Sequence, residues 1–200
     1  LSIDSYNPKV IAVSKTFKEQ DILPLLNSGH CDFGENKVQE ALDKWTDIKL
    51  KNNDIKLHLI GKLQTNKVKF CLPLFDYIHS LDNFKLADKI ANEQVKKNFK
   101  PKIFIQVNVG DEAQKSGVAL KEFESFYKKI TENFELNIIG LMCIPPFVED
   151  TKKYFEKMIE LKSKTNLKEL SMGMSDDYIE AVKNSSTFIR VGSKIMGRRN

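Results

Sequence analysis

Short apolar runs of strand length alternate with longer segments of helical apolar spacing along the whole chain. Such alternation indicates a parallel α/β fold, in which each helix returns the chain to the start of the next strand. Seven segments have the helical spacing: residues 22–27, 37–46, 65–71, 85–98, 121–133, 151–165 and 177–183. Eight runs have the strand pattern: residues 10–13, 31–33, 57–61, 77–80, 103–109, 138–144, 169–172 and 187–192.

Eight strands favour a (β/α)8 barrel over an open doubly wound sheet, which more often has about five to seven strands and a glycine-rich first turn. Seven helices are one fewer than a complete barrel needs, so one apolar flank would be exposed. The chain starts at Leu1 without methionine and enters its first strand almost at once. We therefore expect that an amphipathic N-terminal helix preceding Leu1 is missing from this sequence.

The composition predicts one domain, residues 1–200, because 41% hydrophobic residues suffice for one substantial core and no linker or repeat divides the chain. Three cysteines without C-x-x-C spacing suggest neither disulfides nor a zinc site, which favours a reducing, cytoplasmic location. The three scattered histidines argue against metal binding. No apolar stretch approaches the roughly 20 residues that cross a bilayer, and no signal peptide is visible.

The charge pattern separates lysine from arginine. The net charge of +5 comes mostly from lysines near acidic residues, which indicates a solvated surface better than nucleic-acid binding. All three arginines fall in the last eleven residues, at Arg190, Arg198 and Arg199. A lysine-rich chain that places arginine in one region is expected to use its planar guanidinium there.

If the chain is a barrel, the loops after its strands form the functional face. Lys15 follows the first strand, where an apolar neighbourhood can desolvate the amine, and such lysines form Schiff bases with aldehydes. The alternative for Lys15 is an ordinary solvated lysine after a buried strand.

Two further strand ends have the residues of an anion site. Residues 171–177 offer the hydroxyls of Ser171 and Ser175 before a helix, where free amides can hold a phosphate. Residues 190–193 offer Arg190, Gly192 and Ser193. The alternatives are a helix cap by Ser175 or Asp176, and a surface ion pair of Arg190. A lysine, hydroxyls and an arginine together point to pyridoxal phosphate.

The chain also resembles the pyridoxal phosphate homeostasis protein family, which is related to the barrel of alanine racemase and to fold-type III pyridoxal phosphate proteins. Matching segments occur in order along the whole chain. They are residues 12–16 (AVSKT), 32–40 (DFGENKVQE), 58–67 (HLIGKLQTNK), 106–109 (QVNV), 115–117 (KSG), 140–142 (GLM), 171–176 (SMGMSD) and 190–193 (RVGS). Two departures are the position of Lys62, often histidine in the family, and the absence of the family's N-terminal helix.

The resemblance implies a barrel that binds pyridoxal phosphate at its mouth, with Lys15 as the Schiff-base lysine. It places Asn36 near the cofactor and Arg190 against the pyridine nitrogen, where a cation disfavours protonation of the ring. The phosphate is expected near Ser171, Ser175, Gly192 and Ser193, and the sequence leaves open which serine is closer.

Two functions follow from the resemblance. The first is a carrier that holds and transfers the cofactor to apo-enzymes with little or no turnover. The alternative is an amino-acid racemase, which needs a second acid or base opposite Lys15. We favour the carrier, because no tyrosine lies in an obvious corresponding segment and the chain has no room for the racemase's second domain. A third hypothesis, a protein that contacts nucleic acid, is supported only by the positive net charge. The sequence leaves open a monomer or a weak dimer.

Overall fold

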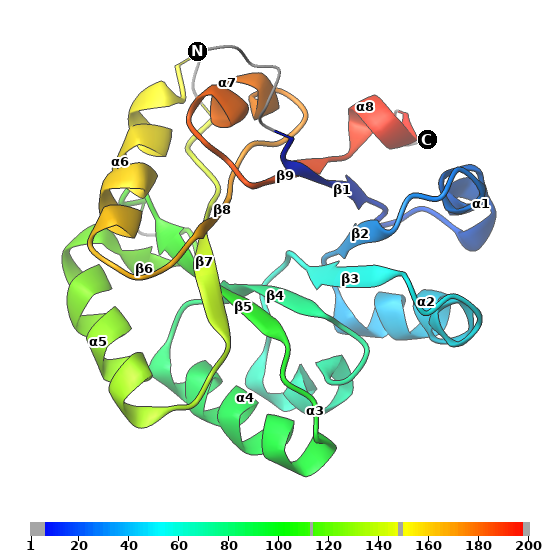
Figure 1. Ribbon diagram of the computed structural model, residues 1–200, viewed down its shortest axis with the longest axis horizontal. Coiled ribbons are helices and arrows are strands. Elements are labelled where there is room, and N and C mark those ends of the chain that lie inside the picture. The colour runs from blue at the N-terminus through cyan, green and yellow to red at the C-terminus, as the bar shows by residue number, and fades with distance from the viewer. Residues whose placement is uncertain (1–6, 113, 148–149, 198–200) are drawn as a thin grey trace.

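The structure is a computed structural model that describes residues 7–112, 114–147 and 150–197. In these residues eight parallel strands form a closed ring surrounded by helices (Figure 1). The order around the ring is β4-β3-β2-β1-β9-β8-β7-β5, and pairing of β4 with β5 closes it. The strands are β1 (Lys9–Val13), β2 (Asp32–Glu35), β3 (Lys56–Leu59), β4 (Tyr77–Leu81), β5 (Lys102–Asn108), β7 (Ile138–Cys143), β8 (Glu169–Ser171) and β9 (Phe188–Val191).

The predicted (β/α)8 barrel is thus confirmed, and each of the seven predicted helices is present. Two begin with a 3-10 turn, η2 (Thr65–Lys67) before α3 and η3 (Leu120–Glu122) before α5. The helices are α1 (Glu19–Asn27), α2 (Val38–Lys51), α3 (Val68–Cys71), α4 (Phe84–Lys97), α5 (Phe123–Asn133), α6 (Lys152–Ser163) and α7 (Tyr178–Lys183).

Two short elements were not predicted. Strand β6 (Val118–Ala119) adds to β5 inside the loop that leads to α5, and helix α8 (Ser193–Met196) follows β9. Elements of two and four residues are too short to show a hydrophobic period. The predicted helix before Leu1 lies outside the described residues, as do Arg198 and Arg199.

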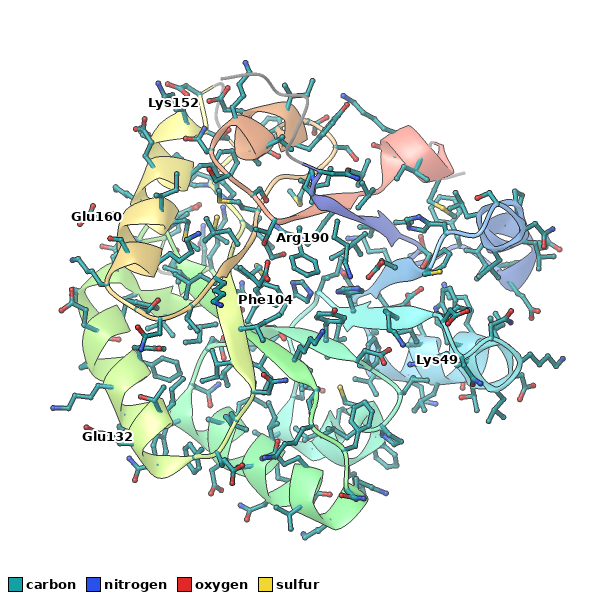
Figure 2. All side chains as sticks on the ribbon, in the orientation of Figure 1. Lys49, Phe104, Glu132, Lys152, Glu160 and Arg190 are labelled. Atoms are coloured by element: carbon teal, nitrogen blue, oxygen red, sulfur yellow. The ribbon has the colours of Figure 1, made fainter. Side chains whose placement is uncertain are left out.

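The barrel has two apolar layers because strand side chains alternate between its interior and the helices. Five buried side chains form a cluster of their own, contributed by five different strands: Ile11, Tyr77, Phe104, Met142 and Phe188. A larger cluster lies between the strands and the helices. Figure 2 shows Phe104 and Arg190 near the centre of the ring, while Glu132 on α5 and Lys152 and Glu160 on α6 point outward.

Within the described segments, no helix is long and apolar enough to span a membrane. The outer faces of the helices carry many lysine–glutamate pairs, such as Lys89 with Glu93 on α4 and Lys152 with Glu156 on α6. The surface therefore mixes both signs of charge, as the sequence pattern predicts.

Candidate functional site

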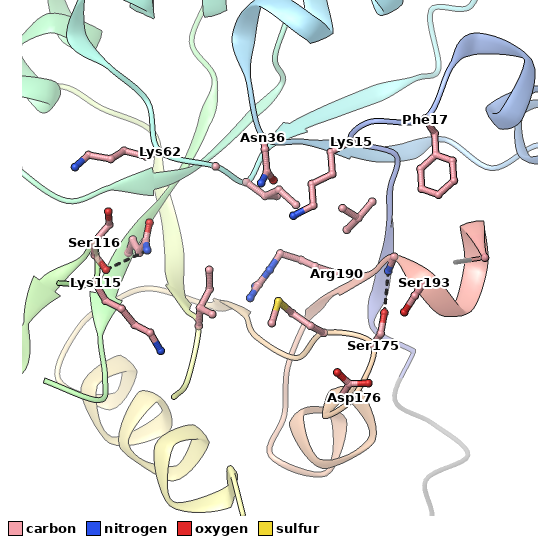
Figure 3. A pocket seen from close by; sticks show the side chains of 18 of the residues that line it. Lys15, Phe17, Asn36, Lys62, Lys115, Ser116, Ser175, Asp176, Arg190 and Ser193 are labelled. Carbon is pink, nitrogen blue, oxygen red and sulfur yellow. Dashed lines mark hydrogen bonds between the residues drawn. The ribbon is translucent and has the colours of Figure 1, made fainter. Parts of the chain in front are cut away.

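A cavity of about 860 Å³ opens at the carboxyl ends of the strands (Figure 3). Its lining comes mainly from the loops after β1, β2, β3, β5, β7, β8 and β9, so it lies where the loops of a barrel converge. Six of the seven residues predicted for the site line this cavity; the exception is Ser171. The six are Lys15, Asn36, Ser175, Arg190, Gly192 and Ser193.

Lys15 lies in a tight turn directly after β1. The turn is closed by a hydrogen bond of 3.2 Å from the amide of Phe17 to the carbonyl of Ser14. Lys15 is half-buried, and in Figure 3 its amine points into the cavity on the side of Arg190. The end of the first strand therefore presents a primary amine to the enclosed space.

Arg190 is on β9 and is only 3% exposed. Its Nη1 donates to the hydroxyl of Ser171 at 2.8 Å, and its Nη2 donates to the carbonyl of Cys143 at 2.8 Å. Both acceptors are neutral, and burial lowers the pKa of the guanidinium from its ordinary value. The alternative of a surface ion pair is therefore wrong, because Arg190 is a buried cation at the cavity.

Two loops with hydroxyl groups are joined beside Arg190. The Ser175 hydroxyl, after β8, accepts a hydrogen bond of 3.1 Å from the amide of Gly192, after β9. Helix α7 begins after Asp177, whose carboxylate accepts from the amide of Met174 at 2.6 Å. The capping alternative for Ser175 is thus wrong, because Ser175 links two strand ends instead of capping α7.

Lysines add positive charge at the rim. Lys62 and Lys115 line the cavity, and Lys115 pairs with Glu112 at 2.6 Å. Lys37, the residue before α2, does not line it and pairs with Glu40 in the first turn of that helix. Three of the described lining residues are therefore lysines, and one of them, Lys15, belongs to the turn after β1.

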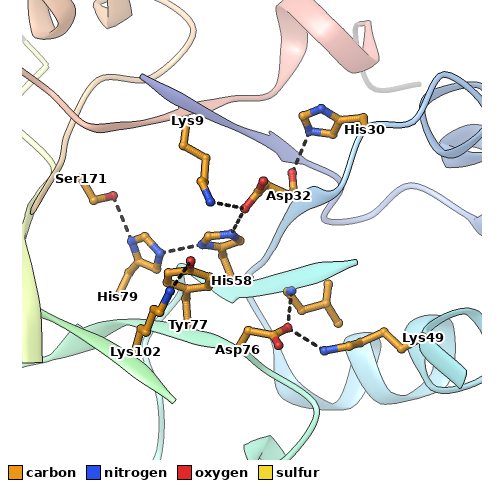
Figure 4. Close-up of polar contacts among 11 residues, drawn as sticks. Lys9, His30, Asp32, Lys49, His58, Asp76, Tyr77, His79, Lys102 and Ser171 are labelled. Atoms are coloured by element: carbon orange, nitrogen blue, oxygen red, sulfur yellow. Dashed lines mark hydrogen bonds and ion pairs between the residues drawn. The ribbon is translucent and has the colours of Figure 1, made fainter. Parts of the chain in front are cut away.

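A chain of polar side chains runs through the barrel interior away from Arg190 (Figure 4). The Ser171 hydroxyl lies 2.9 Å from Nδ1 of His79, and Nε2 of His79 lies 3.0 Å from Nδ1 of His58. Nε2 of His58 lies 2.9 Å from Oδ1 of Asp32. This chain is not predicted from the sequence, because its members stand on four different strands.

One arrangement of protons satisfies every link of this chain. Arg190 donates to Ser171, Ser171 donates to His79, His79 donates to His58, and His58 donates to the carboxylate of Asp32. Both imidazoles are neutral in this arrangement, each with one nitrogen donating and the other accepting. Burial lowers the pKa of His58 and takes that of His79 well below its ordinary value, which agrees with neutral rings.

Among the residues that the structure describes, no group of three or more histidine, cysteine, aspartate or glutamate side chains could hold a metal ion. The two buried histidines instead stack on aromatic rings, His58 on Tyr77 at 4.1 Å and His79 on Phe104 at 4.3 Å between ring centroids. In the sequence, each of these two histidines is a polar residue inside an apolar strand, and this was the signal that could have indicated a buried histidine.

The family model described as the N-terminal domain of alanine racemase matches residues 3–200. The class of the protein is therefore a barrel of the alanine racemase type. A "Pyridoxal phosphate homeostasis protein" of Aquifex aeolicus is 38% identical, and the match covers 96% of this chain and 87% of the relative. The chain belongs to the pyridoxal phosphate homeostasis protein family, as the resemblance predicts.

Solved structures give the same result for the fold. PipY of Synechococcus elongatus, determined without the cofactor, superposes with a TM-score of 0.88 at 32% identity over 97% of this chain and 95% of that one. PipY with pyridoxal phosphate bound superposes with a TM-score of 0.86 at 32% identity, covering 95% of this chain and 92% of that one.

Proposed function

We propose that this protein binds pyridoxal 5'-phosphate at the barrel mouth and serves in homeostasis of that cofactor. The cofactor's aldehyde condenses with primary amines when it is bound. Lys15 is our candidate for that amine, since it follows β1 and points into the cavity. The single observation that carries the proposal is the meeting of Lys15, the buried Arg190 and two serine hydroxyls around one cavity.

The residues of the mouth fit the cofactor's chemical groups. Hydroxyls of Ser175 and Ser193 on adjoining loops provide donors for a phosphate. A Cβ at Gly192 would reach only ordinary contact distance of Val13, so the backbone of this glycine is not crowded. Arg190 provides a buried cation for the pyridine ring, and Asn36 also lines the cavity. We propose that Ser171 acts through Arg190, because its hydroxyl accepts a hydrogen bond from the guanidinium. We assign it no direct contact with the phosphate.

We further propose that the protein is a carrier with little or no turnover. A racemase needs a second proton-transfer group on the substrate face opposite Lys15. Among the described cavity residues no tyrosine or histidine is present to fill that role. We propose that residues 1–200 form one domain, that the protein is a monomer or a weak dimer, and that it is located in the cytoplasm. We also propose that it transfers pyridoxal phosphate to apo-enzymes.

The test is reduction with borohydride after addition of pyridoxal phosphate, followed by peptide mass mapping. We expect one stoichiometric adduct on Lys15, and its loss in Lys15→Ala with an unchanged circular dichroism spectrum. Lys62→Ala, which removes another amine of the same cavity, is the matched control and should keep the adduct. An adduct that survives in Lys15→Ala would refute the assignment of this lysine.

Carrier and racemase are separated by exchange of the α-proton of amino acids with deuterium. For a carrier we expect no exchange above that of free pyridoxal phosphate, measured by NMR on alanine and other amino acids. Sustained exchange at rates typical of enzymes, about 1 to 10³ s⁻¹, would replace the carrier proposal by the racemase.

A further inference from the structure

The turn that bears Lys15 has an unusual backbone. Ser14 to Phe17 form a hydrogen-bonded turn in which Thr16 has a φ of 69°. Positive φ at the third residue of such a turn is usually taken by glycine or asparagine, and it is unfavourable for a β-branched residue. A conformation of this kind persists only where the surroundings hold it in place.

Lys44 on α2 holds both ends of this turn. Its Nζ donates to the carbonyl of Ser14 at 2.7 Å and to the carbonyl of Phe17 at 2.9 Å. The same ammonium pairs with Oε1 of Glu35 at 2.7 Å. Its three donors therefore have three acceptors, two of which are the first and last carbonyls of the turn.

Glu35, at the end of β2, joins this contact to the barrel. Its side chain is fully buried, and Oε1 also accepts from the hydroxyl of Ser14 at 2.7 Å and from Nε1 of Trp45 at 3.0 Å. The Lys44 side chain is only 10% exposed. Neither Lys44 nor Glu35 lines the cavity, so the pair touches the turn from behind.

Stability alone does not explain why a buried Lys44–Glu35 ion pair is present here. Buried ion pairs can often be replaced by apolar residues without loss of stability, because desolvation of both charges offsets their attraction. An apolar pair, however, could not donate hydrogen bonds to the two carbonyls of the turn, as the Lys44 ammonium does while it pairs with Glu35. The geometry therefore connects the pair with the conformation of the turn.

We propose that Lys44 and Glu35 are positioning residues for Lys15, holding the Ser14–Phe17 turn so that the Lys15 amine points into the cavity. The inference rests on the proposed binding of pyridoxal phosphate at this mouth. It assigns a role to two residues that touch neither the cofactor nor the cavity.

The same helix provides a matched control. Lys49, also on α2, pairs with Asp76 at 2.6 Å and donates to the carbonyl of Leu74 at 2.8 Å. It is 19% exposed and its contacts lie in the segment that leads into β4, at the opposite end of the barrel from the cavity. Lys49→Met thus removes a comparable ion pair from the same helix without touching the turn.

The experiment separates formation of the Lys15 adduct from binding of the rest of the cofactor. Pyridoxine 5'-phosphate keeps the ring and the phosphate but has no aldehyde, so its affinity reports the cavity alone. For Lys44→Met we expect the rate of the borohydride-trapped Lys15 adduct to fall about tenfold or more. The affinity for pyridoxine 5'-phosphate should stay within about twofold of the wild-type value, and Lys49→Met should change neither quantity.

A second variant protects the test against misfolding. Lys44→Met leaves the Glu35 carboxylate buried and unpaired, which is costly; Lys44→Met with Glu35→Gln removes both charges and keeps an acceptor for Ser14 and Trp45. It should show the same slow adduct. Hydrogen exchange without ligand should be faster at the Phe17 amide in both Lys44 variants and unchanged in Lys49→Met.

The outcomes are distinct. A folded double variant that forms the adduct at the wild-type rate overturns the positioning role. An equal loss of adduct rate and of pyridoxine 5'-phosphate affinity overturns it too, since it indicates general loosening of the mouth. If the wild-type protein forms no Lys15 adduct and binds neither compound, the proposed function itself has failed.

Discussion

At the scale of single residues, the structure separates two serines that the sequence leaves equivalent. Ser171 is fully buried between Arg190 and His79, whereas Ser175 lines the cavity. Ser171→Ala leaves a guanidinium N–H and an imidazole nitrogen without this partner, so we expect a loss of about 1–3 kcal/mol in unfolding free energy. Its affinity for pyridoxine 5'-phosphate should stay within about threefold of wild type, a margin of under 1 kcal/mol.

Ser175→Ala is the matched counterpart. It removes only the acceptor of the Gly192 amide, so the loss in urea unfolding should be smaller than for Ser171→Ala. The affinity should be about tenfold weaker, the loss of one hydrogen bond of roughly 1.4 kcal/mol. Urea unfolding and ligand titration of both variants measure the four quantities. Weak binding by Ser171→Ala with normal stability would contradict this division of roles.

The mouth residues could be predicted from the sequence because each follows a strand, and the barrel rule brings strand ends together. The interior chain could not. His58 is 26 residues from Asp32 and 21 from His79 in sequence, and only the register of β2, β3 and β4 makes them neighbours. The role of Lys44 could not be predicted either, because a lysine on a predicted helix is normally solvated.

At the scale of elements, the pairing of β7 with β8 depends on a close approach of their backbones. A Cβ at Gly140 on β7 would overlap the backbone carbonyl of its register partner Glu169 on β8, and a backbone atom cannot move aside as a side chain can. The three-residue strand β8 also carries Ser171, so a shift of β8 disturbs the partner of Arg190. Gly140→Ala is therefore expected to destabilise the protein by about 2–3 kcal/mol in urea unfolding.

Gly29→Ala is the comparison for this prediction. Gly29 has a positive φ of 83° but open space around it, so its substitution costs only backbone strain, about 1 kcal/mol. Gly140→Ala should be the more damaging of the two. If the order is reversed, strand β7 tolerates a Cβ and the close approach does not limit the pairing of β7 with β8.

The elements themselves were largely predictable. Strand and helix ends differ from the predicted ones mostly by one to three residues, and the largest difference is α2, which continues to Lys51 because Ile48 is still buried against the core. Strand β6 was missed because two residues have no period, and its pairing with β5 is a tertiary contact. Propensity describes local preference, whereas these ends are decided by packing.

At the scale of the whole molecule, the interior histidines make stability depend on pH. The pKa values of His58 and His79 lie below their ordinary value of 6.5 in the folded barrel, because burial disfavours the charged rings. In the unfolded chain both titrate near that value. Below pH 6.5 the unfolded state therefore binds more protons than the folded state, and stability falls as the pH falls.

Each neutral histidine contributes a slope of up to about 1.4 kcal/mol per pH unit in this window. Asp32 acts in a more acidic range: its pKa lies below its ordinary value of 3.8 despite the opposing effect of burial, because His58 donates to it and Lys9 lies nearby. Its stabilising contribution is complete above pH 3.8 and is lost as the pH falls through the lowered pKa. Between pH 7.5 and 5.5 the histidines alone should set the change.

The measurement is urea unfolding at pH 7.5, 6.5 and 5.5. In His79→Gln the amide can still donate to His58 and accept from Ser171, but it binds no proton, so the loss of stability toward pH 5.5 should be clearly smaller than in the wild type. Equal slopes in His79→Gln and the wild type would mean that the interior rings accept protons without cost, which would contradict the neutral chain from Arg190 to Asp32.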